Sequence, residues 1–440
     1  MDRVVQGTMG ALGLALYLFS FPSAWAFEPL YERAPIHYHD TEPNTKVTRW
    51  FATEEARIAL SSGTDQDTLG ALLKGLDVPV ESQILVYSKT SAQNSRISPK
   101  TPRAIYFSDD VYIGWVQGGE IEVASFDEKL GMVFHLVRLS QRGETGMPSL
   151  VRERSCLNCH AGSSNRNFPG VMVRSVYAGP TGQPLFQAGT FHTRHDSPIG
   201  ERWGGWYVTG VVDEETHLGN CIAEGGLRSD TVELVKLSEE PVEALDDFFE
   251  TGPYLNGGRS DVVALMILEH QVGVHNKLVE ANITTRVTLH RDRELKQAFG
   301  EPFDGPLSET NQRILDHLAD DVLEGMLYAD EFALPGGVQG GPEFAAAFSR
   351  AERKSSAGRS LRDLRLYERI MKYRCSHLIY SEAFDHLPQE IRSLILTKLH
   401  GVLTSASEHP DFVHLSDSER DHIHLIVSET VSNLPAVWTE

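Results

Sequence analysis

Five residues near the middle of the chain, Cys156-Leu157-Asn158-Cys159-His160, place two thiols and an imidazole within one helical turn. Residues three apart share a face of a helix, so both sulfurs can reach the same edge of a flat ligand. The C-x-x-C-H spacing is that of covalent haem attachment, in which each cysteine forms a thioether to one vinyl group. The following histidine is placed to bind the iron. The motif therefore predicts one haem c per chain, held by Cys156 and Cys159, with His160 as the proximal iron ligand.

The N-terminus has the three-part pattern of a secretory signal peptide. Arg3 precedes an apolar run over about residues 9–21, and an A-x-A cleavage pattern occupies residues 24–26. The run is short for a transmembrane span, although an uncleaved membrane anchor is the alternative interpretation. We expect residues 1–26 to be removed and the bacterial protein to be periplasmic or otherwise exported. Haem attachment to this motif belongs to exported compartments, so the two signals support each other.

The chain is acidic, with a formal net charge of -21 over 440 residues. Removing residues 1–26 removes one acid, Asp2, and one base, Arg3, so the mature chain keeps a charge of -21. Such a surface argues against nucleic acid and against anionic membranes as partners, and it is compatible with a basic redox partner protein. A second apolar run of transmembrane length is not found, so we expect no transmembrane span in the mature chain.

Four cysteines are present, and haem attachment accounts for two of them. The other two, Cys221 and Cys375, could pair in an oxidising compartment. The alternative is that they are two separate buried thiols that behave as small hydrophobic residues, and we favour this interpretation.

The hydrophobic pattern changes along the chain and predicts an α+β fold. Short β-prone runs divided by turn signals surround the haem motif in a region over residues 27–225. A mainly α-helical region is expected over residues 226–440, because apolar residues there recur at helical spacing. The expected strands cover residues 83–89, 103–107, 111–116, 120–125, 132–139, 171–177, 184–191 and 206–212. The expected helices cover residues 54–60, 68–73, 261–299, 309–326, 342–350, 360–371, 388–399 and 418–434.

A haem held on one side by histidine leaves a sixth iron position to be filled by a ligand or left open. Met172 follows the motif closely and is better explained as a strand core residue. We expect a histidine instead, with His270 or His195 as the first candidates. His270 lies on the expected long helix, which is a rigid support, while His195 follows an expected strand near the motif. His275 shares the helix with His270 but is rotated by about 140° from it, so the two cannot easily share one metal.

Residues 202–207, Arg-Trp-Gly-Gly-Trp-Tyr, bring aromatic rings together around two glycines. Two interpretations stay open: the rings cover the haem, or they form an aromatic core strand with a bend. Arginines near the motif are candidates to pair with the two haem propionates. They are Arg154, Arg166, Arg174, Arg194 and Arg202.

The motif at residues 156–160 behind a signal peptide resembles the c-type cytochromes. The segments over residues 202–210, 269–276 and 380–384 are similar to uncharacterised exported proteins with a single haem c motif. This resemblance implies a periplasmic mono-haem cytochrome that binds haem and transfers electrons. A haem enzyme with an open iron site, such as a peroxidase, and a haem-based ligand sensor or binding protein are the alternatives, and iron coordination distinguishes them.

Overall fold

The computed structural model describes residues 28–142, 146–213, 215–225, 232–350, 353–405 and 410–439. The expected signal peptide at residues 1–26 lies outside these ranges. Within them the chain is strand-rich before about residue 225 and mainly helical afterwards, which confirms the expected α+β class. The boundary expected at residues 225 and 226 stays a prediction, since one hydrophobic core contains residues from both sides of it.

A seven-stranded sheet organises the N-terminal part of the molecule. Its strands follow the order β6-β5-β4-β3-β2-β1-β9, and every neighbouring pair is antiparallel. Most connections are short, so strands adjacent in sequence are also adjacent in the sheet. The strands are β1 (Ile84–Val86), β2 (Arg103–Phe107), β3 (Val111–Trp115), β4 (Ile121–Asp127), β5 (Gly131–Arg142), β6 (Pro148–Arg152) and β9 (Trp206–Tyr207).

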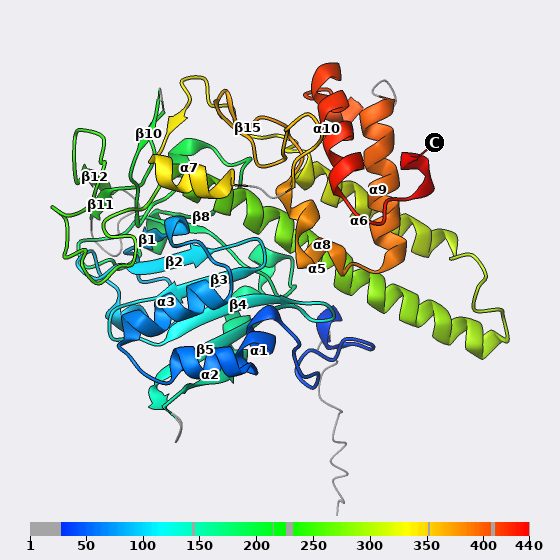
Figure 1. Ribbon diagram of the computed structural model, residues 1–440, viewed down its shortest axis with the longest axis horizontal. Coiled ribbons are helices and arrows are strands. Elements are labelled where there is room, and N and C mark those ends of the chain that lie inside the picture. The colour runs from blue at the N-terminus through cyan, green and yellow to red at the C-terminus, as the bar shows by residue number, and fades with distance from the viewer. Residues whose placement is uncertain are drawn as a thin grey trace, which may run out of the picture.

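Helices cover the two faces of this sheet and create two hydrophobic cores (Figure 1). Successive strand residues point to opposite faces, so Val123 and Val137 join one core while Ala124 and Phe134 join the other. The first core is closed by three short helices, and the second, larger core by α5 (Val262–Phe299). The short helices are α1 (Lys46–Phe51), α2 (Glu54–Leu60) and α3 (Asp65–Gly75).

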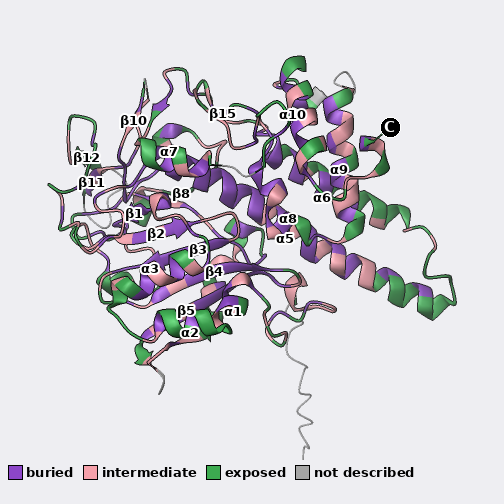
Figure 2. Cartoon of the chain, in the orientation of Figure 1, coloured by how far each residue is buried: buried purple, intermediate pink, exposed green. Residues whose placement is uncertain are grey.

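The long helix α5 connects the sheet to the helical part of the molecule. Its first turn is capped by the Asp261 carboxylate, which accepts bonds from the backbone of Val263 and Ala264, and it ends at Gly300 in the left-handed conformation. Its first half is buried on nearly every side, whereas its last turns are exposed, as Figure 2 shows at the far tip of the molecule. A helix buried all round can position polar side chains deep in the protein.

Three helices pack together beside α5 in the C-terminal region, namely α6 (Glu309–Met326), α9 (Gln389–Thr404) and α10 (Asp417–Thr430). Ser416 caps α10, because its side chain accepts a hydrogen bond from the backbone of Glu419. Shorter helices are α4 (Leu157–His160), α7 (Pro342–Phe348) and α8 (Glu382–Asp385). The remaining strands are β7 (Arg174–Val176), β8 (Thr190–His192), β10 (Val211–Val212), β11 (Cys221–Glu224), β12 (Glu233–Lys236), β13 (Val338–Gln339), β14 (Leu364–Tyr367) and β15 (Arg369–Met371).

Two expected elements are wrong. The helix expected over residues 360–371 is the hairpin β14–β15, which turns at Glu368 with a positive φ of 63°. Apolar residues in this stretch alternate in burial as strand residues do, and the turn interrupts any helical run. The strand expected over residues 184–191 is a 3-10 turn at Phe186–Ala188 followed by β8, because Gly189 adopts a φ of 134°.

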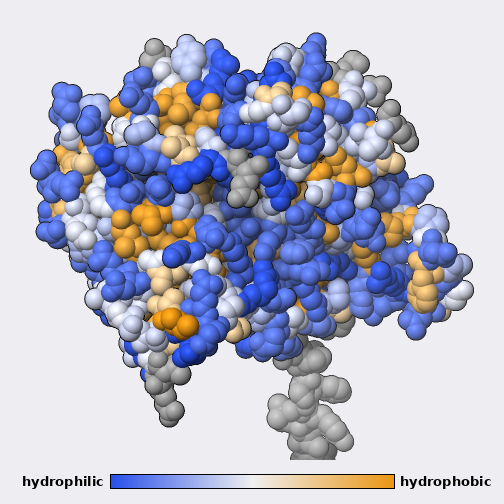
Figure 3. Space-filling view, in the orientation of Figure 1, coloured by the Kyte–Doolittle hydropathy of each residue, from blue (hydrophilic) through white to orange (hydrophobic). Residues whose placement is uncertain are grey.

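The surface of the molecule is mostly hydrophilic, with separate hydrophobic patches on the face that Figure 3 displays. Within the described ranges, no helix has both the length and the apolar character that a membrane crossing requires. Cys221 and Cys375 are both buried and unpaired, in agreement with the interpretation as separate thiols.

Candidate haem-attachment site

The C-x-x-C-H motif follows the edge strand β6 and forms a short helical segment. A 3-10 turn at Arg154–Cys156 leads directly into α4 (Leu157–His160), so the motif has the helical form that its spacing requires. Leu157 is buried in the larger core and anchors the segment. Cys156 is half-buried against that core, whereas Cys159 is exposed. With Leu157 buried, both Cys156 and Cys159 lie at or near the protein surface.

The two ring nitrogens of His160 have different surroundings. Nδ1 lies 2.9 Å from the carbonyl oxygen of Gly170, and because a carbonyl only accepts, Nδ1 carries the proton. The lone pair of the neutral ring is therefore on Nε2, which forms no hydrogen bond with a described residue. The ring also packs on Phe134 of β5, with 4.6 Å between centroids. This arrangement fixes the tautomer and orientation that a metal-binding histidine needs.

The loop that supplies the Gly170 carbonyl is held in place from both ends. The backbone N–H of Gly170 donates to the His160 carbonyl at 2.9 Å, and the Asn165 amide donates to the same carbonyl at 2.8 Å. From α5, Asn276 forms two bonds with the backbone of Val171, at 3.0 and 2.8 Å. A Cβ atom at Gly170 would lie 2.3 Å from the Asn276 side-chain oxygen, so this close approach requires glycine.

Burial sets the protonation of the motif residues. It lowers the pKa of His160, while the bond to Gly170 acts in the opposite direction, so the neutral imidazole is favoured. Burial raises the pKa of the Cys156 thiol to about 12, so this sulfur is a thiol at neutral pH. A neutral imidazole with a lone pair on Nε2 and two unpaired cysteines are the groups that haem c attachment uses. The residues present therefore fit the group that the motif predicts.

His195 and His270, the two candidates for the sixth ligand, contact each other instead. His195 Nε2 lies 3.3 Å from the Ala329 carbonyl, so this nitrogen carries the proton and Nδ1 is an acceptor. His270 Nδ1, at 3.3 Å, donates to that acceptor, and its Nε2 accepts from the Ser376 hydroxyl at 2.8 Å. Both lone pairs are thus used in hydrogen bonds. Neither imidazole presents a lone pair for iron, and their role as the sixth ligand stays a prediction.

This histidine cluster is buried and rigidly packed. The His270 ring is 1% exposed and stacks on Tyr328 with 3.8 Å between centroids and 5° between planes. Burial lowers the pKa of His270 well below its ordinary value and that of His195 to about 4, so both are neutral. Next to them Glu269 pairs with Arg202 at 2.9 Å, both almost fully buried. The cluster is therefore a structural element in this state of the protein.

The other candidates occupy different environments. His275 bonds to the Tyr112 hydroxyl at 2.6 Å in the core, and Met172 is half-buried rather than part of the core. Trp203 and Trp206 belong to the larger core. Among the arginines proposed for haem propionates, Arg202 pairs with Glu269, Arg166 with Glu280 and Asp321, and Arg194 with Asp196. Arg174 bonds to Thr190 and Arg154 to the His39 carbonyl.

Three residues important to this site were not identified from the sequence: Phe134, Gly170 and Asn276. Gly170 follows Pro169 and so carries a turn signal, but nothing in a Pro-Gly pair indicates that its carbonyl reaches a histidine ten residues earlier. Asn276 lies more than a hundred residues beyond the loop it holds. Such long-range contacts leave no mark in local spacing.

Comparisons with known proteins give no further identification. A scan against family models finds no match, and searches of curated proteins and of solved structures find none either.

Proposed function

We propose that this chain is an exported bacterial mono-haem c-type cytochrome that transfers electrons. One observation supports it most strongly: the motif histidine donates from Nδ1 to the Gly170 carbonyl and keeps Nε2 unpartnered within the described structure. The buried His270, by contrast, uses both of its nitrogens in hydrogen bonds. His160 therefore has the tautomer and the ring orientation that an iron ligand would need, with its lone pair on Nε2.

Bound haem would supply the one-electron chemistry of its iron. Cys156 and Cys159 would hold the macrocycle through two thioethers, and His160 would be the iron ligand that the protein supplies beside them. The hydrogen bond that His160 Nδ1 donates to the Gly170 carbonyl increases the basicity of the ring and fixes its plane. Asn276 keeps the Gly170 loop in register with α5 and so maintains that bond.

The hydrogen bonds of His195 and His270 favour a second candidate function, that of a haem protein with an open sixth iron position. Because both lone pairs are engaged, these residues support an iron site without a histidine on its sixth position. An open position belongs to haem enzymes, such as peroxidases, or to haem-based ligand sensors and binding proteins. If His195 or His270 is the sixth ligand of an electron-transfer haem, it must exchange a present hydrogen-bond partner for iron.

The partner in electron transfer is proposed to be a basic protein. The net charge of -21 would steer a positively charged partner and repel nucleic acid and anionic membranes. The association rate should then fall as ionic strength rises, since screening acts beyond about 8–10 Å at ordinary salt. A rate independent of salt would contradict this part of the proposal.

Expression with export in a bacterium that matures c-type haem tests the proposal directly. Intact mass should equal the chain from Phe27 onward plus one haem, and the denatured protein should keep its haem absorption. Replacing Cys156 and Cys159 by serine should abolish covalent haem. The matched control is the double replacement of Cys221 and Cys375, which should leave haem content unchanged.

The spectrum of the purified ferric protein then separates the two candidates. A six-coordinate low-spin spectrum supports electron transfer, and a high-spin spectrum that responds to cyanide supports the open site. A wild-type mass without haem under these conditions would overturn both.

A further inference from the structure

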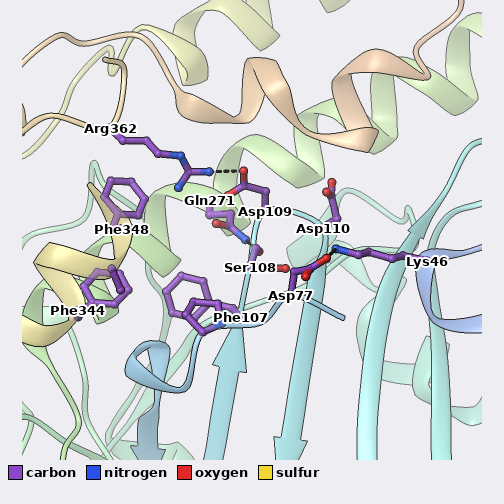
Figure 4. Close-up of a pocket in the computed structure, with 12 residues that line it drawn as sticks. Lys46, Asp77, Phe107, Ser108, Asp109, Asp110, Gln271, Phe344, Phe348 and Arg362 are labelled. Carbon is purple, nitrogen blue, oxygen red and sulfur yellow. Dashed lines mark hydrogen bonds and ion pairs between the residues drawn. The ribbon is translucent and has the colours of Figure 1, made fainter. Parts of the chain in front are cut away.

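A cavity of about 270 Å³ lies on the molecule apart from the haem motif. It is bounded by the turn between β2 and β3, by the end of α3, by α7 and by the loop that carries Arg362. Figure 4 shows three phenyl rings on one side of it, and the charged side chains above and on the other side. A pocket with an apolar wall and a few convergent polar groups is the usual form of a small-molecule site.

Four of the five charged side chains that line this cavity form two ion pairs, and the fifth is Asp110. Arg362 forms an ion pair with Asp109, and Lys46 pairs with Asp77 at 3.0 Å. Among the described residues, Asp110 forms no ion pair and accepts one hydrogen bond, from the backbone of Glu382 at 2.7 Å; Lys46 acts on it only at longer range. Burial, together with the neighbouring carboxylates of Asp109 and Glu382, raises the pKa of Asp110 to about 7. Above about pH 7, the ionised Asp110 therefore gives the site one negative charge that forms no ion pair among the described residues.

The opposite wall suits a cation with an apolar body. Phe344 lies between Phe107 and Phe348, with centroid distances of 6.0 and 5.9 Å. The faces of aromatic rings attract cations, and Phe348 already has the Arg362 guanidinium 4.9 Å from its centroid. A cationic ligand could place its apolar part against these rings and its charge towards Asp110.

The buried side of the cavity is built around a second polar group. Asp109 lies between Arg362 and His377, whose Nε2 is 3.6 Å from the carboxylate. His377 is fully buried and packs edge-on against Phe348, and neither of its ring nitrogens has a hydrogen-bond partner in the described structure. His377 lies behind the lining residues Asp109 and Phe348 and fixes their positions from the core side.

We propose that this cavity binds a small organic monocation, namely a primary amine with an apolar or aromatic body, with its ammonium group at Asp110 and its body against Phe107, Phe344 and Phe348. Two features exclude an anion as the better ligand: both lining cations are already paired, and the unpaired charge is a carboxylate. The inference does not depend on the proposed haem, because it uses none of the motif residues.

Calorimetry with three matched probes tests this inference on the full mature chain, whether or not it carries haem. Benzylammonium, benzyl alcohol and benzoate share a ring and differ in charge. At about pH 8, above the raised pKa of Asp110, benzylammonium should bind about ten-fold or more tightly than benzyl alcohol, the difference that one charge-assisted hydrogen bond supplies. Benzoate should bind more weakly than either.

Three variants test whether benzylammonium binds in this cavity. Asp110→Asn keeps an oxygen acceptor for the Glu382 N–H but removes the charge, so the preference for benzylammonium over benzyl alcohol should disappear. Asp411→Asn removes one exposed negative charge elsewhere and should leave the preference intact. Phe344→Leu keeps an apolar side chain but removes the ring face, and benzylammonium affinity should fall.

Several results would overturn the inference: no binding of benzylammonium, equal or tighter binding of benzoate or benzyl alcohol, or an unchanged preference in Asp110→Asn. The ranking of the three probes on the wild-type chain remains decisive even if a variant fails to fold.

Discussion

The imidazole of His160 and those of the pair His195–His270 differ in how many of their ring nitrogens form hydrogen bonds. His160 uses one nitrogen for a backbone carbonyl and leaves the other unpartnered among the described residues. In the pair, every nitrogen has a partner, and the protons can be assigned along one chain from Ser376 to Ala329. In the described structure His160 therefore keeps a lone pair for a ligand, whereas the lone pairs of His195 and His270 are used in hydrogen bonds. An unpartnered nitrogen alone does not identify a metal ligand, because the buried His275 and His377 have one too.

The sharpest test of this comparison removes the His160 ring. His160→Gly should keep haem on the two cysteines but lose the protein imidazole, changing the iron coordination of nearly all molecules. Added free imidazole should restore the wild-type spectrum, because it can enter the vacated space. A variant with the wild-type spectrum before any addition would show that His160 is not an iron ligand.

The buried pair beside the histidine cluster should have the largest effect on stability. Glu269→Gln leaves the Arg202 guanidinium without its carboxylate in the core, and breaking such a pair costs about 3–5 kcal/mol. Urea unfolding measures this change. Arg313→Gln, in an exposed ion pair with Glu309, is the control and should unfold at the wild-type denaturant concentration.

His270→Leu distinguishes a structural histidine from an iron ligand. It removes two hydrogen bonds and the stack on Tyr328, so the free energy of unfolding should fall by about 2–4 kcal/mol. The iron spectrum should stay as in the wild type if the pair is structural. A new high-spin signal would instead identify His270 as the sixth ligand and contradict its assignment as a structural histidine.

The buried cluster also predicts a graded dependence of stability on pH. Burial lowers the pKa of His195 to about 4, whereas the unfolded chain has the ordinary value of about 6.5. The unfolded state therefore binds more protons within this range, so stability is fully present above about pH 6.5 and declines towards about pH 4. His195→Gln should reduce the slope of unfolding free energy against pH, and an unchanged slope would contradict the assignment.

The smallest expected effect concerns the support of the haem site. Asn276→Ala removes two hydrogen bonds to Val171, each contributing about 1 kcal/mol. The Gly170 carbonyl should then hold His160 less firmly, and the reduction potential of the haem protein should shift while haem content stays constant. Asn311→Ala, which removes a bond to Asp292 far along α5, should leave the potential unchanged.

The sequence predicted correctly those helices and strands whose pattern of apolar residues lies within a short stretch of the chain. The helices at Glu309–Met326 and Val262–Phe299 and the strand at Arg103–Phe107 match their expected ranges closely, because periodic burial and caps specify them. The motif residues were recognisable for the same reason. The Gly170 carbonyl, the Asn276 contacts and the meeting of His195 with His270 depend on tertiary packing, which spacing along the chain does not record. The hairpin β14–β15 was missed because Glu368 adopts a left-handed turn that its residue type does not indicate.

The separation between the haem motif and its support on α5 has a consequence for the order of assembly. The sheet strands that hold Phe134 precede the motif, but Asn276 follows Val171 by 105 residues. A chain that crosses a membrane with its N-terminus leading would present both cysteines to the maturation machinery long before α5 arrives. Contacts of such high sequence separation form late, because a long loop must close first. If haem is attached during export as proposed, closure of the Gly170 loop by α5 would follow the attachment.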